Sequence, residues 1–271
     1  MNIVITGAGG VLCSAFSRAL AADGHKIALL DLNLEAAERE AEGIRKAGGE
    51  AIAVQTNVLD KESLKKAHDV VLEKFGPCEV LINGAGGNNP KGTTTSEYFS
   101  KEDMLDKNAR SFFDLDQDSV SFVFNLNFLG TLLTTQAFAT DMLETGGCIV
   151  NISSMNAFTP LTKIPAYSGA KAAVSNFTQW LAVHFANCNI RVNAIAPGFF
   201  ATNQNRTLLF NEDGSLTPRS HKIISQTPMG RFGEPEELLG TLRFLIDNDA
   251  SGFVTGITIP VDGGFSAYSG V

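Results

Sequence analysis

Short apolar runs alternate with amphipathic stretches along most of the chain. The apolar runs are bounded by polar or glycine-rich segments, which is typical of buried strands, and the amphipathic stretches repeat with the period of a helix. The strands predicted in this way are 2–6, 26–30, 51–54, 79–82, 148–152, 190–195 and 256–260. The helices predicted between them are 11–23, 34–47, 61–75, one that ends near 143, 165–185 and 235–245.

This alternation predicts an α/β protein, a single-domain doubly wound parallel sheet of the Rossmann type with helices on both faces. No linker, repeat or low-complexity tract divides the chain, so we expect one domain over residues 1–271. Two insertions interrupt the rhythm, at about 87–119 and 203–229. We expect the first to be a long loop with one short helix. Loops of this length in a compact domain usually carry function or are disordered.

The composition is that of an ordinary globular protein. The 271 residues are 44% hydrophobic and 18% charged, the formal net charge is −8 and the pI is about 5.0. Binding to nucleic acid needs a concentrated basic face, and the charges here are spread along the chain, so we expect no nucleic-acid partner. We also expect no membrane segment and no signal peptide, because every apolar run is too short.

The four cysteines lie far apart in the sequence and form no Cys/Cys or Cys/His cluster of the kind that binds metals. They are Cys13, Cys78, Cys148 and Cys188. We therefore expect no metal site. Reduced thiols fit a reducing compartment, so we predict a cytoplasmic protein.

A glycine-rich turn follows the first predicted strand. Its members are Gly7, Gly9 and Gly10, and the helix behind it begins with Val11 and Leu12. Glycines let a pyrophosphate approach the backbone closely, and the helix N-terminus attracts the anion. A plain structural turn is the alternative, but the position between the first strand and the first helix favours a dinucleotide site.

Asp31 stands at the end of the second predicted strand, 24 residues after Gly7. A carboxylate at this point can accept hydrogen bonds from the adenosine ribose hydroxyls and would repel a 2′-phosphate. No lysine or arginine lies in the glycine turn or directly after Asp31, and Arg39 falls on the following helix. The sequence therefore favours NAD over NADP, although a surface carboxylate that caps a loop is an alternative.

Polar or glycine-containing segments also follow the third and fourth predicted strands. They contain Asn57 and Val58, and then Asn83, Ala85 and Gly86. The carboxyl ends of the strands form the ligand crevice of a doubly wound sheet, so these residues are further candidates for cofactor contacts. Ordinary turn chemistry explains either segment equally well.

Tyr167 and Lys171 are four residues apart on a predicted helix and therefore share a face. A free tyrosine has a pKa near 10. We expect the ammonium of Lys171 and the positive nicotinamide of oxidised cofactor to lower it, so that the phenol exchanges a proton with a substrate oxygen. Ser154 can hydrogen-bond the same oxygen, and Asn127 can hold a water that links Lys171 to solvent. Alone, a Tyr/Lys pair of this spacing is common on ordinary helices.

The joint pattern resembles the short-chain dehydrogenase/reductase family over essentially the whole chain. The matching segments are Thr6 to Gly10, Asn83 to Gly86, Asn127, Ile152 to Ser154, Tyr167 to Lys171, Asn193 to Gly198, and Val261 to Gly264. The resemblance implies a catalytic tetrad of Asn127, Ser154, Tyr167 and Lys171. It also implies that Tyr167 and Lys171 contact the cofactor, with Lys171 on the nicotinamide ribose, and that Pro197, Gly198 and Thr202 lie at the nicotinamide.

The chain departs from the family pattern at two places. The family usually has glycines at the positions of Val11 and Cys13, and it has a second asparagine at the position of Gly84. The first departure puts the detailed shape of the phosphate turn in doubt. Neither departure removes a catalytic group.

The insertions carry many polar and basic groups and few aromatic ones, which suits a hydroxylated anionic substrate. The first insertion and the segment 154–160 resemble one branch of the family, the D-mannonate oxidoreductases, which implies interconversion of D-mannonate and D-fructuronate. We expect Lys91, Asn156 or an arginine of the insertions to hold the substrate carboxylate, with Asn156 as the first choice.

Two other classes of function stay open at this point. One is a different reductase of the same family, such as a gluconate 5-dehydrogenase or a 3-ketoacyl carrier-protein reductase. The other is a non-catalytic regulator that binds NAD, against which the intact tetrad argues. The resemblance also implies a homotetramer, with the helices of Asn127 and Tyr167 at one interface.

Overall fold

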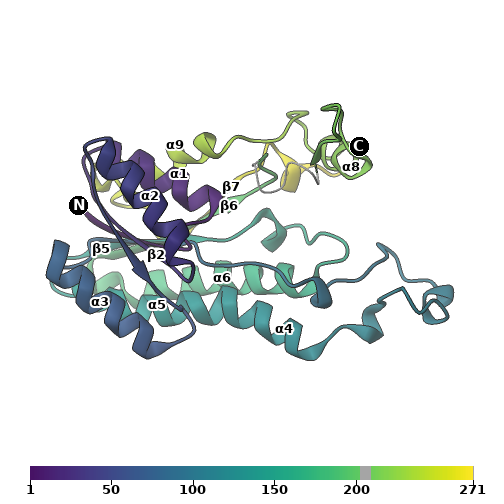
Figure 1. The fold of residues 1–271 in the computed structure, drawn as a ribbon, viewed down its shortest axis with the longest axis horizontal. Coiled ribbons are helices and arrows are strands. Elements are labelled where there is room, and N and C mark those ends of the chain that lie inside the picture. The colour runs from purple at the N-terminus through teal and green to yellow at the C-terminus, as the bar shows by residue number, and fades with distance from the viewer. Residues whose placement is uncertain (202–208, 271) are drawn as a thin grey trace.

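The structure is a computed structural model that describes residues 1–201 and 209–270. Seven parallel strands form one sheet in the order β3-β2-β1-β4-β5-β6-β7 (Figure 1). The strands are β1 (Asn2–Thr6), β2 (Lys26–Asp31), β3 (Glu50–Gln55), β4 (Val80–Asn83), β5 (Gly147–Ile152), β6 (Ile190–Pro197) and β7 (Thr258–Val261). The strand order reverses at β1, as a doubly wound sheet requires, so the predicted fold class is confirmed.

Helices cover both faces of the sheet (Figure 1). One face carries α1 (Val11–Ala22), α2 (Leu34–Lys46) and α9 (Leu239–Ile246). The other face carries α3 (Lys61–Phe75), α4 (Gln117–Phe124), α5 (Gly130–Phe138) and α6 (Pro165–His184). Alternate residues of each strand serve the two cores: Ile3 and Ile5 pack towards α1, and Val4 packs towards α3.

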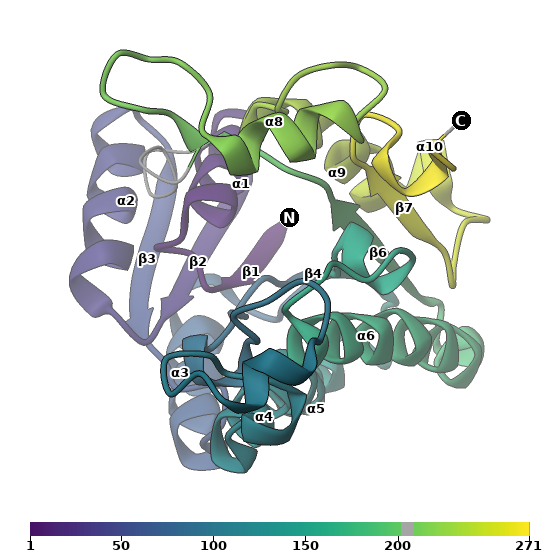
Figure 2. The same ribbon diagram turned by 90° about the vertical axis from the view of Figure 1, so that its right-hand side faces the viewer.

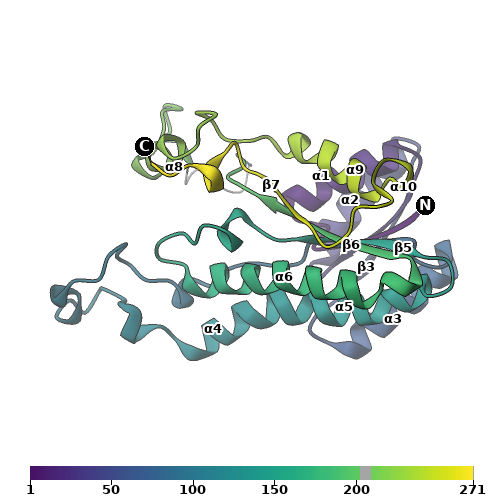
Figure 3. The same cartoon turned by 180° about the vertical axis from the view of Figure 1, so that it is seen from behind.

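The helix predicted to end near residue 143 is interrupted. A π turn (Asn125–Leu129) joins α4 to α5, and the 3-10 turn η5 (Ala139–Met142) follows α5. α4 and the π turn lie alongside α6 (Figure 3). The predicted helix 235–245 is likewise divided, into the 3-10 turn η8 (Pro235–Leu238) and α9.

The first insertion is more ordered than one short helix. It contains three 3-10 turns, η1 (Pro90–Gly92), η2 (Lys101–Met104) and η3 (Phe112–Asp114), so the predicted single helix is wrong. A polar residue precedes each turn, and at η1 and η3 its side chain accepts a hydrogen bond from the backbone of the turn, which stabilises such short elements. Outside the predictions, the structure also has α8 (Pro218–Ser225), α10 (Asn248–Ser251) and the 3-10 turns η6 (Met155–Ala157), η7 (Ala186–Cys188) and η9 (Phe265–Ala267).

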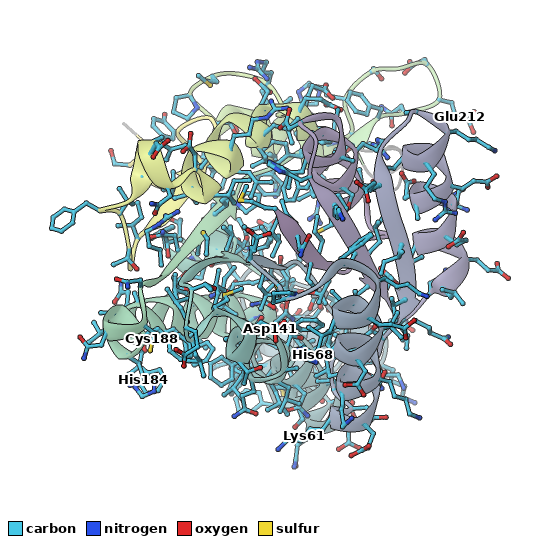
Figure 4. All side chains as sticks on the ribbon, turned by 90° about the vertical axis from the view of Figure 1, so that its left-hand side faces the viewer. Lys61, His68, Asp141, His184, Cys188 and Glu212 are labelled. Carbon is cyan, nitrogen blue, oxygen red and sulfur yellow. The ribbon has the colours of Figure 1, made fainter. Side chains whose placement is uncertain are left out.

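A histidine–carboxylate pair fastens the helices below the sheet. Nε2 of His68 on α3 lies 2.8 Å from Oδ1 of Asp141, and the two side chains point toward one another (Figure 4). Oδ2 of Asp141 accepts a hydrogen bond of 2.8 Å from the backbone N–H of Cys78, just before β4. Because this pair ties α3 to η5 and to the start of β4, we assign it to the scaffold.

Candidate active site

The predicted site residues lie at the carboxyl edge of the sheet. Figure 2 looks onto this edge, from which both insertions project. β1 and β4 are hydrogen-bonded neighbours here although β2, β3 and three helices lie between them in sequence. Ligand crevices of doubly wound sheets form where the strand order reverses in this way.

The glycine turn has the geometry that a pyrophosphate needs. Gly7 has a φ of 66°, and a Cβ at this residue would lie 2.9 Å from backbone atoms of Ala85. Gly10 caps α1 without a side-chain hydrogen bond, so the N–H groups at the start of the helix, including those of Val11 and Leu12, are not capped by a side chain. These residues therefore fit a bound dinucleotide phosphate.

Asp31 ends β2 directly beside this turn. Its Oδ2 accepts a hydrogen bond of 2.9 Å from the N–H of Gly9, and its Oδ1 accepts one of 2.8 Å from the N–H of Asn33. The backbone thus fixes the carboxylate in one orientation. Since each carboxylate oxygen has two lone pairs, acceptor capacity remains for ribose hydroxyls.

The residues at the ends of β3 and β4 differ in where they point. Oδ1 of Asn57 accepts from the N–H of Leu59 in a local turn, and Val58 is buried. The side chain of Asn83 points into the protein, where its Nδ2 donates to Asn151 at 2.9 Å and to Thr135 at 3.1 Å. Asn83 can therefore meet a cofactor only through its backbone.

The hydroxyl of Thr6 fixes the segment that follows β4, a role that was not predicted from the sequence. Its Oγ1 accepts hydrogen bonds from the N–H groups of Gly84 at 3.1 Å and Ala85 at 3.2 Å. At the end of β6, the N–H of Gly198 donates to Val261, and a Cβ at Gly198 would lie 2.5 Å from Cα of Asp262. Pro197 is the last residue of β6, and Thr202 lies outside the described residues.

The four predicted catalytic residues come from three elements. Tyr167 lies in the first turn of α6 and Lys171 one turn later, with Nζ of Lys171 5.7 Å from the centroid of the Tyr167 ring. Nζ of Lys171 donates a hydrogen bond of 2.7 Å to the carbonyl of Ile152 at the end of β5. Ser154 follows this strand, and its side chain hydrogen-bonds to the phenol of Tyr167.

The π turn places Asn127 in this group. Its Nδ2 donates to the carbonyls of Val123 and Gly87, and its Oδ1 accepts from the N–H of Gly87. A Cβ at Gly86 would lie 2.6 Å from Oδ1 of Asn127 and 3.2 Å from Nζ of Lys171, so both groups border this glycine. Asn127 therefore fixes the start of the first insertion, and its predicted role in holding a water stays a prediction.

Burial dominates the charge states of the pair. It raises the pKa of Tyr167, and only the hydrogen bond with Ser154 opposes this rise. It also lowers the pKa of Lys171 to about 8. In the cofactor-free protein burial is the main cause of the shift, and the ammonium of Lys171 is directed to Ile152. The predicted lowering of the Tyr167 pKa by Lys171 together with oxidised cofactor stays a prediction.

The two predicted substrate contacts lie in different environments. Asn156 is buried two residues after Ser154, and within the described residues its Oδ1 has no hydrogen-bond partner. A buried amide oxygen without a partner is costly, so a ligand hydroxyl would stabilise it. Lys91 is exposed at η1 and its charge acts on Asp116.

No group of three metal-ligating side chains occurs among the residues that the structure describes. No described helix combines the length and the apolar character that crossing a bilayer demands. Cys13, Cys78 and Cys148 are buried free thiols.

Comparisons with known proteins identify the family. The model of the short chain dehydrogenases matches residues 1–213, and the chain belongs to this family of oxidoreductases. An uncharacterised oxidoreductase of Haemophilus influenzae is 61% identical over 270 residues, 99% of this chain and 94% of that protein. The uncharacterised oxidoreductase UxuB of Bacillus subtilis is 53% identical over 269 residues, 99% and 95% of the two chains.

A crystal structure shares the whole fold. It is that of a candidate D-mannonate oxidoreductase from Haemophilus influenzae with bound NAD, and it superimposes with a TM-score of 0.95 at 61% identity, covering 99% of this chain and 96% of that chain. The family predicted from the motifs is thereby confirmed, and so is its class of enzyme.

Proposed function

We propose that the protein transfers a hydride between NAD and a secondary alcohol or ketone of a sugar acid, D-mannonate and D-fructuronate being the substrate pair. The observation that carries the proposal is the convergence of Asn127, Ser154, Tyr167 and Lys171 beside a dinucleotide-type turn. NAD accepts or supplies the hydride when it is bound. Gly7, Gly9, Gly10, Val11 and Leu12 would hold its phosphates, Asp31 would hold the adenosine ribose, and Lys171 would hold the nicotinamide ribose.

The protein's own residues manage the proton. Tyr167 gives its phenolic proton to the ketone oxygen during reduction and takes a proton from the alcohol during oxidation. Ser154 already hydrogen-bonds to the phenol, so it orients the same oxygen towards Tyr167. Lys171, with a pKa lowered to about 8, lies one helical turn from Tyr167 and would supply the proton that restores the phenol.

The substrate class rests on the polar lining and on similarity. The Oδ1 of Asn156 lacks a hydrogen-bond donor, and a sugar acid has several hydroxyls, so one of them can donate to Asn156 while another reacts at Tyr167. The candidate D-mannonate oxidoreductase described above shares 61% of its residues with this chain. We therefore retain Asn156 as a substrate contact, in the role of acceptor from a hydroxyl.

We expect purified protein to oxidise D-mannonate with NAD at a kcat/KM of at least about 10⁴ M⁻¹s⁻¹, an ordinary value for an enzyme on its substrate. The measurement is NADH formation over a panel of D-mannonate, D-gluconate, a 3-hydroxyacyl thioester and a hydroxysteroid. Turnover of only the thioester or the steroid would refute the proposal. Binding of NADH without turnover of any panel member would instead favour a non-catalytic regulator.

Asp31 is expected to set the cofactor preference. Replacing it with serine removes the charge that repels a 2′-phosphate, so the ratio of kcat/KM for NAD to that for NADP should fall by about tenfold or more. An Asp31→Asn variant keeps an acceptor for the N–H of Gly9 while losing the charge, and it should show a similar fall. A ratio that stays unchanged in both variants would contradict the assignment.

The homotetramer and the cytoplasmic location stay predictions. In favour of an interface, α6 exposes Trp180 and Val183, with 56% and 80% of their surface accessible. The ring of His184, at the lower left in Figure 4, stacks on Trp180 at 4.6 Å between centroids. Such an apolar strip on a helix suits contact with a second subunit.

A further inference from the structure

Lys163 lies between the catalytic Ser154 and Tyr167 in an unusual backbone conformation. Its φ is 72°, and among the described residues Asn189 is the one other non-glycine with a positive φ. A lysine adopts this conformation only where its surroundings impose it, and such residues concentrate at functional sites. Here the carbonyl of Lys163 accepts a hydrogen bond of 2.9 Å from the N–H of Thr94, which fastens the first insertion to the entrance of α6.

A salt bridge links the two insertions close to this point. Nζ of Lys222 on α8 lies 2.9 and 3.1 Å from the two carboxylate oxygens of Glu97, three residues after Thr94. The hydrogen bond from Lys222 lowers the pKa of Glu97, and the charge of Lys163 acts in the same direction. The ammonium of Lys222 is therefore paired with Glu97 between the two insertions, and the charge of Lys163 reaches the same carboxylate from the segment just before α6.

We propose that Lys163 and Lys222 bind the carboxylate of the substrate, and that Glu97 occupies this place in the unliganded protein. The inference rests on the proposed function and names the specificity-determining residues of that same site. Two lysines against one glutamate leave an excess of positive charge, which a second carboxylate neutralises. The bridge between Lys222 and Glu97 is largely exposed, so exchanging one carboxylate for another costs little.

This assignment differs from the sequence-based choice of Lys91 or Asn156 for the carboxylate. Lys91 is exposed at η1, where no ion pair is formed with a carboxylate of the described residues, and the unpaired atom of Asn156 is an acceptor. Arg110, the one arginine of the first insertion, donates to the carbonyls of Pro90 and Thr93 and thus holds the loop itself. The carboxylate would then lie between the two insertions, and the reacting alcohol would lie at Tyr167.

The test compares KM for D-mannonate with the inhibition constant of D-mannitol, which has the same hydroxyl chain without the carboxylate. Lys222→Gln and Lys163→Asn should each raise KM for D-mannonate by about tenfold or more, because a hydrogen bond to a charged group is lost. Asparagine tolerates the left-handed conformation at position 163. Both variants should leave kcat and the inhibition by D-mannitol within about twofold of the parent protein.

Two further variants sharpen the comparison. Glu97→Gln removes the competing carboxylate and should lower KM for D-mannonate. A rise in KM would contradict the proposal that the substrate carboxylate takes the place of Glu97. Lys65→Gln is the matched control, because Lys65 pairs with Asp69 on α3 and should not affect KM. If both lysine variants keep the parent KM, or if D-mannitol inhibition weakens as much as D-mannonate binding, Lys163 and Lys222 do not bind the carboxylate. The proposed function would then still stand. If the protein oxidised uncharged alcohols and no sugar acid, both the carboxylate site and the proposed function would be refuted.

Discussion

Replacing Tyr167 by phenylalanine is expected to lower kcat for D-mannonate by about 10²- to 10⁴-fold, the usual contribution of a positioned acid or base. The change removes one oxygen and keeps the ring that packs beside Lys171. NADH binding should therefore stay within about threefold of the parent protein, because no proposed cofactor contact of Lys171 or of the glycine turn is altered. Steady-state NADH absorbance measures the first quantity and a fluorescence titration of NADH the second.

The chain offers a matched control for this change. Tyr98 lies in the first insertion with 82% of its surface exposed, so Tyr98→Phe removes the same hydroxyl from a solvated position. That variant should keep kcat. If Tyr167→Phe turned over D-mannonate as fast as Tyr98→Phe, the phenol would not be the group that exchanges the proton.

The raised pKa of Tyr167 affects how this chemistry starts. Burial keeps the phenol protonated at neutral pH in the cofactor-free protein, so it is ready to donate to a ketone oxygen. Oxidation of an alcohol requires the opposite charge state, in which the phenolate must be stabilised. The positive ring of oxidised NAD would favour the phenolate, and so would Lys171 in its charged form.

Much of the fold could be predicted because its strands and helices have strong local patterns. The runs 2–6 and 61–75 are reproduced to the residue by β1 and α3. The π turn at Asn127 has no such pattern, since the residues around it are all acceptable in a regular helix. Its cause is tertiary: the side chain of Asn127 bonds to the backbone of Gly87, 40 residues earlier.

The same distinction applies to the site. The motif residues could be placed at one edge because parallel strands end together. The pairing of Glu97 with Lys222 joins residues 125 positions apart, and no periodicity predicts it. The side chain of Asn83 points into the protein because it bonds to Thr135 and Asn151, which become its neighbours only in the folded sheet.

Cys13 and Gly84, two of the three residues that depart from the family pattern, contact one another in the core. A Cβ at Gly84 would lie 2.2 Å from Sγ of Cys13 and 2.8 Å from the carbonyl of Thr6. Gly84 has no positive φ, so its backbone would accept alanine and steric overlap is the obstacle. We expect Gly84→Ala to lower the free energy of unfolding by about 3 kcal/mol, at the upper end of overpacking in a core.

A double-mutant cycle tests whether the pair is coupled. Cys13→Gly removes the sulfur and should cost about 1–2 kcal/mol by itself, through a small cavity and a glycine in α1. In the double variant the overlap with sulfur is gone. Its loss of unfolding free energy should therefore be at least about 1 kcal/mol smaller than the sum of the losses in the two single variants, because neighbouring core sites are coupled. Denaturant unfolding of the four proteins measures this, with Gly43→Ala on α2, where a Cβ meets open space, as a control that should not destabilise. Strictly additive losses would mean that the carbonyl of Thr6, and not the sulfur of Cys13, is what excludes a Cβ at Gly84. The two departures from the family pattern would then be unrelated.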